Sequence, residues 1–100
     1  MPEPASGREA LLQEAYIRLR AAKGSFPYER ELGSLLHRLP EFPAAEWDTL
    51  ARAYAQEALL PLADVRVTGV RPIVAFKQLQ AVEIALELYG AQEKVRIDLS

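Results

Sequence analysis

The sequence predicts an α+β domain in which two to three N-terminal helices pack on a small, mostly antiparallel C-terminal sheet. Apolar residues recur at three- and four-residue spacing in the first half of the chain and at every second position in much of the second half. The helical and strand patterns follow one another without interleaving, which is typical of α+β domains. Because 100 residues can bury one modest core, we expect a disordered N-terminus at 1–5 and a single domain over 6–100.

The first helix is predicted over residues 7–23. Ser6 and Glu9 have the spacing of a capping box, in which the two side chains satisfy N–H groups at the start of a helix. Gly24 follows the segment, and glycine tolerates the left-handed backbone that commonly ends a helix. One face of this helix is expected to carry an apolar stripe of Leu12, Ala15, Tyr16, Leu19 and Ala22.

Two further helices are expected before the sheet. A short helix is predicted over residues 31–39, with its leucines on one side and Pro40 at its end. Pro43 suits the first turn of the next helix, because the missing N–H of proline is not needed there. That helix is predicted over residues 43–60. Its inward side chains are expected to be Trp47, Leu50, Ala51, Tyr54, Ala58 and Leu59.

Alternating segments predict three strands. The first covers residues 64–70 and turns Val65 and Val67 inward. The second covers residues 79–89, where four aliphatic residues alternate with Glu83, Ala85 and Glu87.

A turn within residues 89–93 is expected to join the second strand to a third at residues 94–99, so that these two strands form an antiparallel hairpin. Residues 71–78 fit either a loop or an irregular extension of the first strand. The third strand is expected to leave one edge of the sheet open, and an open edge can accept a strand from another chain.

Composition excludes several classes of function. There is no cysteine, so disulfides, thiolate metal sites and cysteine nucleophiles are excluded. The single histidine, His37, cannot build a multi-histidine metal site. A net charge of −2 argues against nucleic acid as a partner, and no apolar run approaches the ~20 residues that span a bilayer. We therefore expect no nucleic acid, no membrane, no metal, no cofactor and no small-molecule substrate.

Paired carboxylates leave one enzymatic alternative open. A glycosidase needs two acids flanking the scissile bond, one of them with a raised pKa. The candidate pairs are Glu29 with Glu31 and Glu9 with Glu14. Arg30 lies between Glu29 and Glu31 in a short segment, and acidic residues in a turn or at the start of a helix are expected to be solvated. We expect no enzymatic activity and assign no catalytic residue; a small muramidase-like glycosidase using Glu29 or Glu31 is the alternative.

Aromatic residues admit two interpretations. Tyr16, Trp47 and Tyr54 occur at helical spacing, which favours core positions over a set that stacks on a ligand. Phe26 and Tyr28 flank a proline in a predicted loop. Apolar side chains in such a loop usually fill the core, although they can also form a docking surface, and we favour the core for both.

A family resemblance depends mainly on residues 18–39. A helix ends in Lys23-Gly24-Ser25, the segment Phe26-Pro27-Tyr28 follows, and Leu32-Gly33-Ser34 leads into a short helix. The matching positions are Arg18, Leu19, Lys23, Gly24, Ser25, Phe26, Pro27, Tyr28, Leu32, Gly33, Ser34, Leu35 and Leu39. In residue type and order the chain resembles the baseplate wedge and sheath-initiator family of contractile phage tails. The members of that family resemble baseplate assembly protein W, and part of the family is labelled phage lysozyme-like.

The resemblance implies a structural protein of a phage or prophage tail baseplate, present in the host cytoplasm during assembly and then in the virion tail. It implies partners among other baseplate, sheath or tube proteins, docked partly by strands shared at the sheet edge. Many members carry Glu-Pro-Arg before the first strand, where this chain has Leu60-Pro61-Leu62-Ala63-Asp64, so the role of that motif is not carried over. A generic protein-binding adaptor is a further alternative. The docking residues that we predict are Gly24, Phe26, Pro27, Tyr28, Gly33, Ser34, Val95, Ile97 and Leu99.

Overall fold

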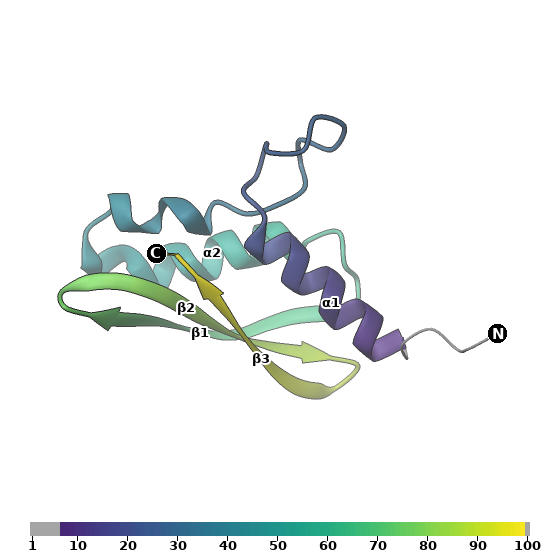
Figure 1. The fold of residues 1–100 in the computed structure, drawn as a ribbon. Coiled ribbons are helices and arrows are strands. Elements are labelled where there is room, and N and C mark those ends of the chain that lie inside the picture. Colours follow the sequence, from purple (N-terminus) through teal and green to yellow (C-terminus); the bar gives the residue numbers. More distant parts are fainter. Residues whose placement is uncertain (1–6, 100) are drawn as a thin grey trace.

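A computed structural model describes residues 7–99 of the chain. Helices come first and lie on one face of a three-stranded antiparallel sheet (Figure 1), which confirms the predicted α+β class. The predicted disordered segment at 1–5 and the capping serine at position 6 lie outside the described residues. The elements are α1 (Gly7–Arg20), η1 (Leu36–Glu41), η2 (Ala44–Glu46), α2 (Trp47–Leu59), β1 (Val65–Ala75), β2 (Gln78–Leu88) and β3 (Ala91–Asp98).

Helix α1 ends at Arg20, three residues before the end that we predicted. The reason is tertiary: Ala21 and Lys23 exchange backbone hydrogen bonds with Ser34, which draws the chain out of the helix. Ala15 and Leu19 are the buried residues of α1. Tyr16 is 37% exposed, so the buried stripe is narrower than predicted and this tyrosine is not a core residue.

The short helix predicted over residues 31–39 is confirmed only in part. It is the 3₁₀ helix η1, which begins at Leu36, later than predicted, and includes Pro40 rather than ending before it. Trp47 stabilises the end of η1, because its Nε1–H lies 2.9 Å from the carbonyl oxygen of Leu39 and 3.0 Å from that of Phe42. The predicted helix over 43–60 is largely confirmed as the short η2 turn followed by α2.

The sheet has the strand order β1-β2-β3, with both pairs antiparallel. Residues 71–75 extend β1, which decides the question that the sequence left open, and the loop to β2 is only Phe76 and Lys77. The β2–β3 hairpin is confirmed, but its turn is only Tyr89-Gly90, so β3 begins at Ala91, earlier than predicted. All four loop residues have positive φ, as in the tight two-residue hairpin loops that match the twist of the strands.

Two irregularities in the β1–β2 pairing keep apolar side chains on the face that the helices cover. The register shifts between Val67 and Gly69 on β1, and again where Gln80 interrupts the pairing on β2. An extra residue in one strand reverses the alternation that follows it. Val67 and Val70 therefore both pack on the core although they are three positions apart.

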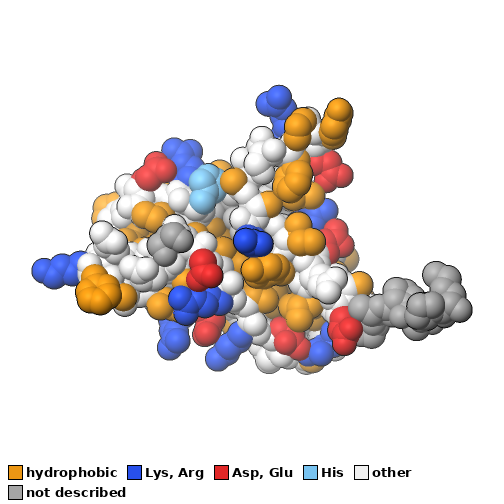
Figure 2. Space-filling view, viewed as in Figure 1, with side chains coloured by type: hydrophobic (Ala, Val, Ile, Leu, Met, Phe, Trp, Pro, Cys, Tyr) orange, Lys and Arg blue, Asp and Glu red, His pale blue; other side chains and the backbone are white. Residues whose placement is uncertain are grey.

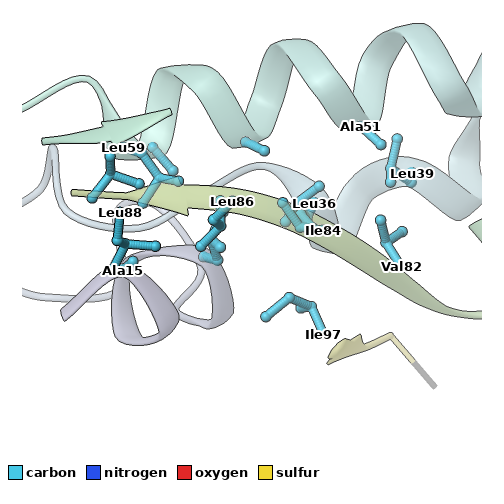
Figure 3. Packing of buried hydrophobic residues seen from close by; sticks show 14 of the residues in the cluster. Ala15, Leu36, Leu39, Ala51, Leu59, Val82, Ile84, Leu86, Leu88 and Ile97 are labelled. Atoms are coloured by element: carbon cyan, nitrogen blue, oxygen red, sulfur yellow. The ribbon is translucent and has the colours of Figure 1, made fainter. Parts of the chain in front are cut away.

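The core lies between the helices and β2 (Figure 3). Val82, Ile84, Leu86 and Leu88 of β2 are fully buried, as their alternation predicted. Leu19 of α1, Leu36 and Leu39 of η1, and alanines of α2 cover them. Trp47 and Tyr54 are partly buried against this cluster, so the core prediction is correct for these two aromatic residues.

The opposite face of the sheet carries ion pairs between neighbouring strands. Arg66 on β1 pairs with Glu87 at 3.9 Å, and Glu83 lies between Arg71 at 3.9 Å and Lys94 at 4.0 Å. This face is therefore polar, as expected for an antiparallel sheet that is covered on one side only. In the described part of the chain, no helix is long and apolar enough to cross a membrane.

Candidate docking surface

Strand β3 forms one edge of the sheet and pairs with β2 without a register shift. Leu99 donates its N–H to the carbonyl of Gln80 at 2.9 Å. In an antiparallel ladder the hydrogen-bonded residues alternate, so Val95 and Ile97 bond β2 while Lys94 and Arg96 direct their backbone N–H and C=O groups away from it. These outward groups can pair with a further strand.

The other edge, β1, is less suited to accept a strand. Pro72 has no N–H to donate, and the bulge beside Gly69 interrupts the regular spacing of the backbone groups. Bulges and prolines are devices that protect edge strands from pairing. The regular, eight-residue β3 carries neither within its bounds, so the two edges differ in what they can bind.

An apolar groove runs between α1 and the edge of β3. It has a volume of about 460 Å³ and is lined by Leu12, Gln13, Tyr16, Ile17 and Val95. Arg8 of α1 and Glu93 of β3 form an ion pair across the same two elements. The groove lies on the helix side of the sheet, so inward side chains of a strand added to β3 would enter it.

A second hollow continues this surface toward the loop that follows α1. It has a volume of about 300 Å³ and is lined by Tyr16, Ile17, Arg20, Ala21 and Phe26. The two hollows share Tyr16 and Ile17, so the apolar surface extends from β3 along α1 to the loop. Figure 2 shows hydrophobic side chains gathered over α1 and over this loop.

The loop over residues 21–34 projects from the body of the molecule (Figure 1). Phe26 is 41% exposed and Tyr28 is 99% exposed, so the preferred core interpretation of both residues is wrong. Pro27 between them is exposed as well. Leu36 and Leu39 already fill the adjacent part of the core, which leaves the loop aromatics at the surface as candidates for docking.

Gly33 and Ser34 are buried, so their side chains do not reach the surface. The Ser34 hydroxyl donates to the carbonyl of Leu19 at 2.7 Å and accepts the N–H of Leu36 at 3.3 Å. The last carbonyls of a helix lack partners within the helix, and Ser34 supplies one to the end of α1. These two residues hold the base of the loop; any role in docking is therefore indirect.

The predicted docking residues on β3 occupy different environments. Val95 lines the apolar groove and is half-buried, whereas Ile97 is buried against the core. Leu99 lies just beyond the end of β3 and is half-buried. Gly24, with φ of 90°, forms the exposed turn after α1. Of the predicted residues, Phe26 and Val95 therefore line the continuous apolar surface directly.

Sequence reasoning missed Tyr16 and Ile17 as surface residues. Both residues lie in the helix that the sequence predicted. Tyr16 was assigned to the apolar stripe that faces the core, and Ile17 was assigned to neither the core nor a binding surface. It also missed Phe76, which is 95% exposed at the tip of the β1–β2 hairpin. Phe76-Lys77 carries no signal for this tip, because it lacks the glycine or asparagine that marks a two-residue hairpin loop.

The acid pair lies on the projecting loop. Glu29 and Glu31 are both exposed, whereas a glycosidase acid lies in an apolar pocket that raises its pKa. His37 is exposed on η1. Within residues 7–99, no three His, Asp or Glu side chains are grouped as metal ligands would be.

Comparisons with known proteins leave the family of this chain open. No protein-family model matches the sequence, and no curated protein matches it. The resemblance of residues 18–39 to the baseplate family therefore stays a prediction.

Proposed function

We propose that this protein is a structural component of a contractile phage or prophage tail baseplate that docks neighbouring tail proteins, partly by accepting a strand at β3. The observation that carries the proposal is the regular, open edge of β3 beside an apolar groove. An open edge gives main-chain hydrogen bonds, and an adjacent apolar surface gives packing for alternate side chains. Those are the two components of recognition by strand addition.

The backbone of β3 provides the first component. Gln92, Lys94, Arg96 and Asp98 alternate with the residues that bond β2, so their N–H and C=O groups face the open side. Each hydrogen bond gained there contributes about 0.5–1.5 kcal/mol net. A short added strand thus gains several such bonds without requiring special side chains.

The loop after α1 provides a second contact area. Phe26 extends the apolar surface, and Tyr28 stands fully in solvent beside it. Exposed aromatic side chains are enriched at protein interfaces because they bury a large area at low entropic cost. The residues that carry the family resemblance cover this loop and the turns at its base. The resemblance and the exposed aromatic side chains therefore both favour this loop as a docking region.

The proposal gives the protein an assembly role, with other baseplate, sheath or tube proteins as partners and with the host cytoplasm and then the virion tail as its location. It assigns no catalytic residue. A generic adaptor would use the same surface for a partner outside the tail, so the identity of the bound protein separates these two functions.

Co-expression with the proteins encoded beside it, followed by size exclusion with light scattering, tests the proposal. We expect a stable complex with a sheath, tube or wedge-like neighbour. A chain that stays alone with each of these neighbours would contradict the tail function.

A proline variant tests whether the edge of β3 is the binding site. Lys94→Pro removes an N–H that points away from β2, so the ladder within the sheet keeps its bonds. Lys94→Thr removes the same charge but keeps the N–H, which makes it the matched control. We expect the proline variant to fold and to lose the complex, while the threonine variant retains most of it. Equal binding by both variants would place the interface elsewhere.

A further inference from the structure

Two of the four outward side chains at the open edge of β3 are basic, and they are neighbours on that face. Gln92, Lys94, Arg96 and Asp98 share the face of the sheet opposite the helices. The side chains of Lys94 and Arg96 are 71% and 57% exposed. A strand added to β3 would place its own side chains directly opposite these two.

Within residues 7–99, the carboxylates beside Lys94 and Arg96 are Glu83, which the register places opposite Arg96, and Asp98, and they do not fully occupy either cation. The Nζ of Lys94 is 4.0 Å from Glu83, but Glu83 is also 3.9 Å from Arg71. Arg96 contacts Asp98 at 2.9 Å through its Nε, and a guanidinium has further N–H donors. Glu83 is thus shared by Arg71 and Lys94, and Asp98 occupies only one side of the Arg96 guanidinium.

A second copy of this chain would meet like charges in two registers of the edge. If two β3 strands paired about Val95, Lys94 of each copy would face Arg96 of the other, and both cross-strand pairs would be repulsive. If they paired about Arg96, the two Arg96 side chains would face each other, while Lys94 of each copy would face Asp98 of the other; this register is the one that the light-scattering control tests. Like charges directly opposite one another destabilise a strand pair, and basic side chains on an edge are a known defence against self-association.

We infer that the strand accepted by β3 has two acidic residues at alternating positions, opposite Lys94 and Arg96, with an apolar residue between them. The apolar residue would lie opposite Val95 and enter the groove lined by Leu12, Tyr16 and Ile17. Acidic side chains would lie on the other face, because successive residues of a strand point to opposite faces. The inference rests on the edge-docking role proposed above and specifies the chemistry of the partner.

Two short capped peptides test this pattern by fluorescence anisotropy at low salt. One has the sequence Thr-Val-Glu-Val-Glu-Val-Thr, and the control has lysine in place of glutamate. We expect the protein to bind the acidic peptide at least about 10-fold more tightly, since both cross-strand charge pairs change from attraction to repulsion in the control. Equal binding of the two peptides, or no binding of the acidic one, would overturn the inference.

Charge reversal in the protein sharpens the test. The double variant Lys94→Glu with Arg96→Glu should prefer the lysine peptide by a similar factor. Because new carboxylates beside Glu83 and Asp98 can weaken the fold, Lys94→Gln with Arg96→Gln provides a milder variant, for which we expect the preference to disappear. A preference for the acidic peptide that persists in the glutamine variant would overturn the assignment of these two cations.

Two controls identify the binding mode. An acidic peptide with N-methylated amides on the side that faces β3 should lose binding, and retained binding would indicate adsorption to a charged surface rather than strand addition. Light scattering should show a monomer in the absence of peptide; a dimer that Lys94→Pro dissociates would make a second copy the occupant and overturn the inference.

The outcome separates this inference from the proposed function. Capture of a tail protein that is equally strong in the charge-reversed variant would leave the baseplate role in place and refute the acidic pattern. Peptide binding with the expected charge reversal, but without capture of any tail protein, would refute the baseplate role and leave the acidic pattern in place.

Discussion

Replacement of Gly33 by alanine should destabilise the fold strongly, because this glycine lies against the backbone at the end of α1. Its φ is 115°, a conformation that side chains disfavour. A Cβ at this position would lie 2.8 Å from the Ala21 oxygen, the Ala22 carbonyl carbon and the Lys23 nitrogen. All three are backbone atoms, so the contact cannot be relieved by the rotation of a side chain.

The magnitude follows from two separate costs. The backbone strain of a residue in such a conformation is about 1–3 kcal/mol. Overpacking against atoms that cannot move adds about 1–3 kcal/mol. Gly24 is the matched control: its φ is 90°, but nothing lies within 4 Å of a Cβ added there. Gly24→Ala therefore carries the first cost alone.

Urea unfolding followed by circular dichroism measures both variants. We expect Gly33→Ala to lose about 2–6 kcal/mol of unfolding free energy, a large fraction of the roughly 5–15 kcal/mol typical of a domain. Gly24→Ala should lose about 1–3 kcal/mol less than that. Equal losses in the two variants, with unchanged denaturant slopes, would refute the close approach of the loop to the end of α1.

Two further stability predictions concern the hairpin tip and the base of the loop. The double variant Phe76→Asn with Lys77→Gly should stabilise the protein by about 1–2 kcal/mol and raise its Tm, because Asn-Gly suits the positive φ of both loop residues. Little packing is lost, since Phe76 is almost fully exposed. An unchanged or lower Tm in a thermal scan would contradict backbone strain at this tip. Ser34→Ala should cost about 1–3 kcal/mol in urea unfolding, because the buried Leu19 carbonyl loses its donor. The exposed Ser25→Ala should cost less, and the reverse order would contradict this role of Ser34.

The fold class was predictable because it depends on patterns that are local in the chain. The change from helical spacing to alternation separates α1 and α2 from the strands. Along β2 the alternation also predicted the buried residues correctly, because this central strand is covered by helices on one face and solvated on the other. The hairpin between β2 and β3 followed from the glycine at position 90 between two alternating segments.

Local patterns were insufficient where a distant segment competes for the same backbone groups. The end of α1 depends on Ser34, which bonds residues 21 and 23 from outside the helix. The segment after Gly33 has leucines at helical spacing, yet the chain forms a 3₁₀ helix there. The bulges in the β1–β2 pairing likewise depend on which residues face each other across the sheet.

The candidate site was predictable in kind but only partly in its residues. An edge position for the third strand followed from the hairpin expected between the second and third strands, and β3 has β2 as its one neighbour in the described sheet. Tyr16 and Ile17 could not be assigned to the groove from the sequence. The apolar spacing along a helix shows which residues share a face, but it does not show which of them the sheet covers. Phe26 and Tyr28 are exposed because other residues fill the core first, and that competition is invisible along the chain.

The sequence alone determined the α+β class, the pairing of the last two strands and the faces of β2, because periodicity acts between near neighbours. Only the tertiary structure decided where α1 ends, which edge of the sheet is regular, and which apolar side chains join into one surface beside β3. Those features depend on how the helices and strands pack in three dimensions and on hydrogen bonds between segments that are far apart in the chain. Burial and edge accessibility are properties of the assembled fold, so the docking surface became visible only there.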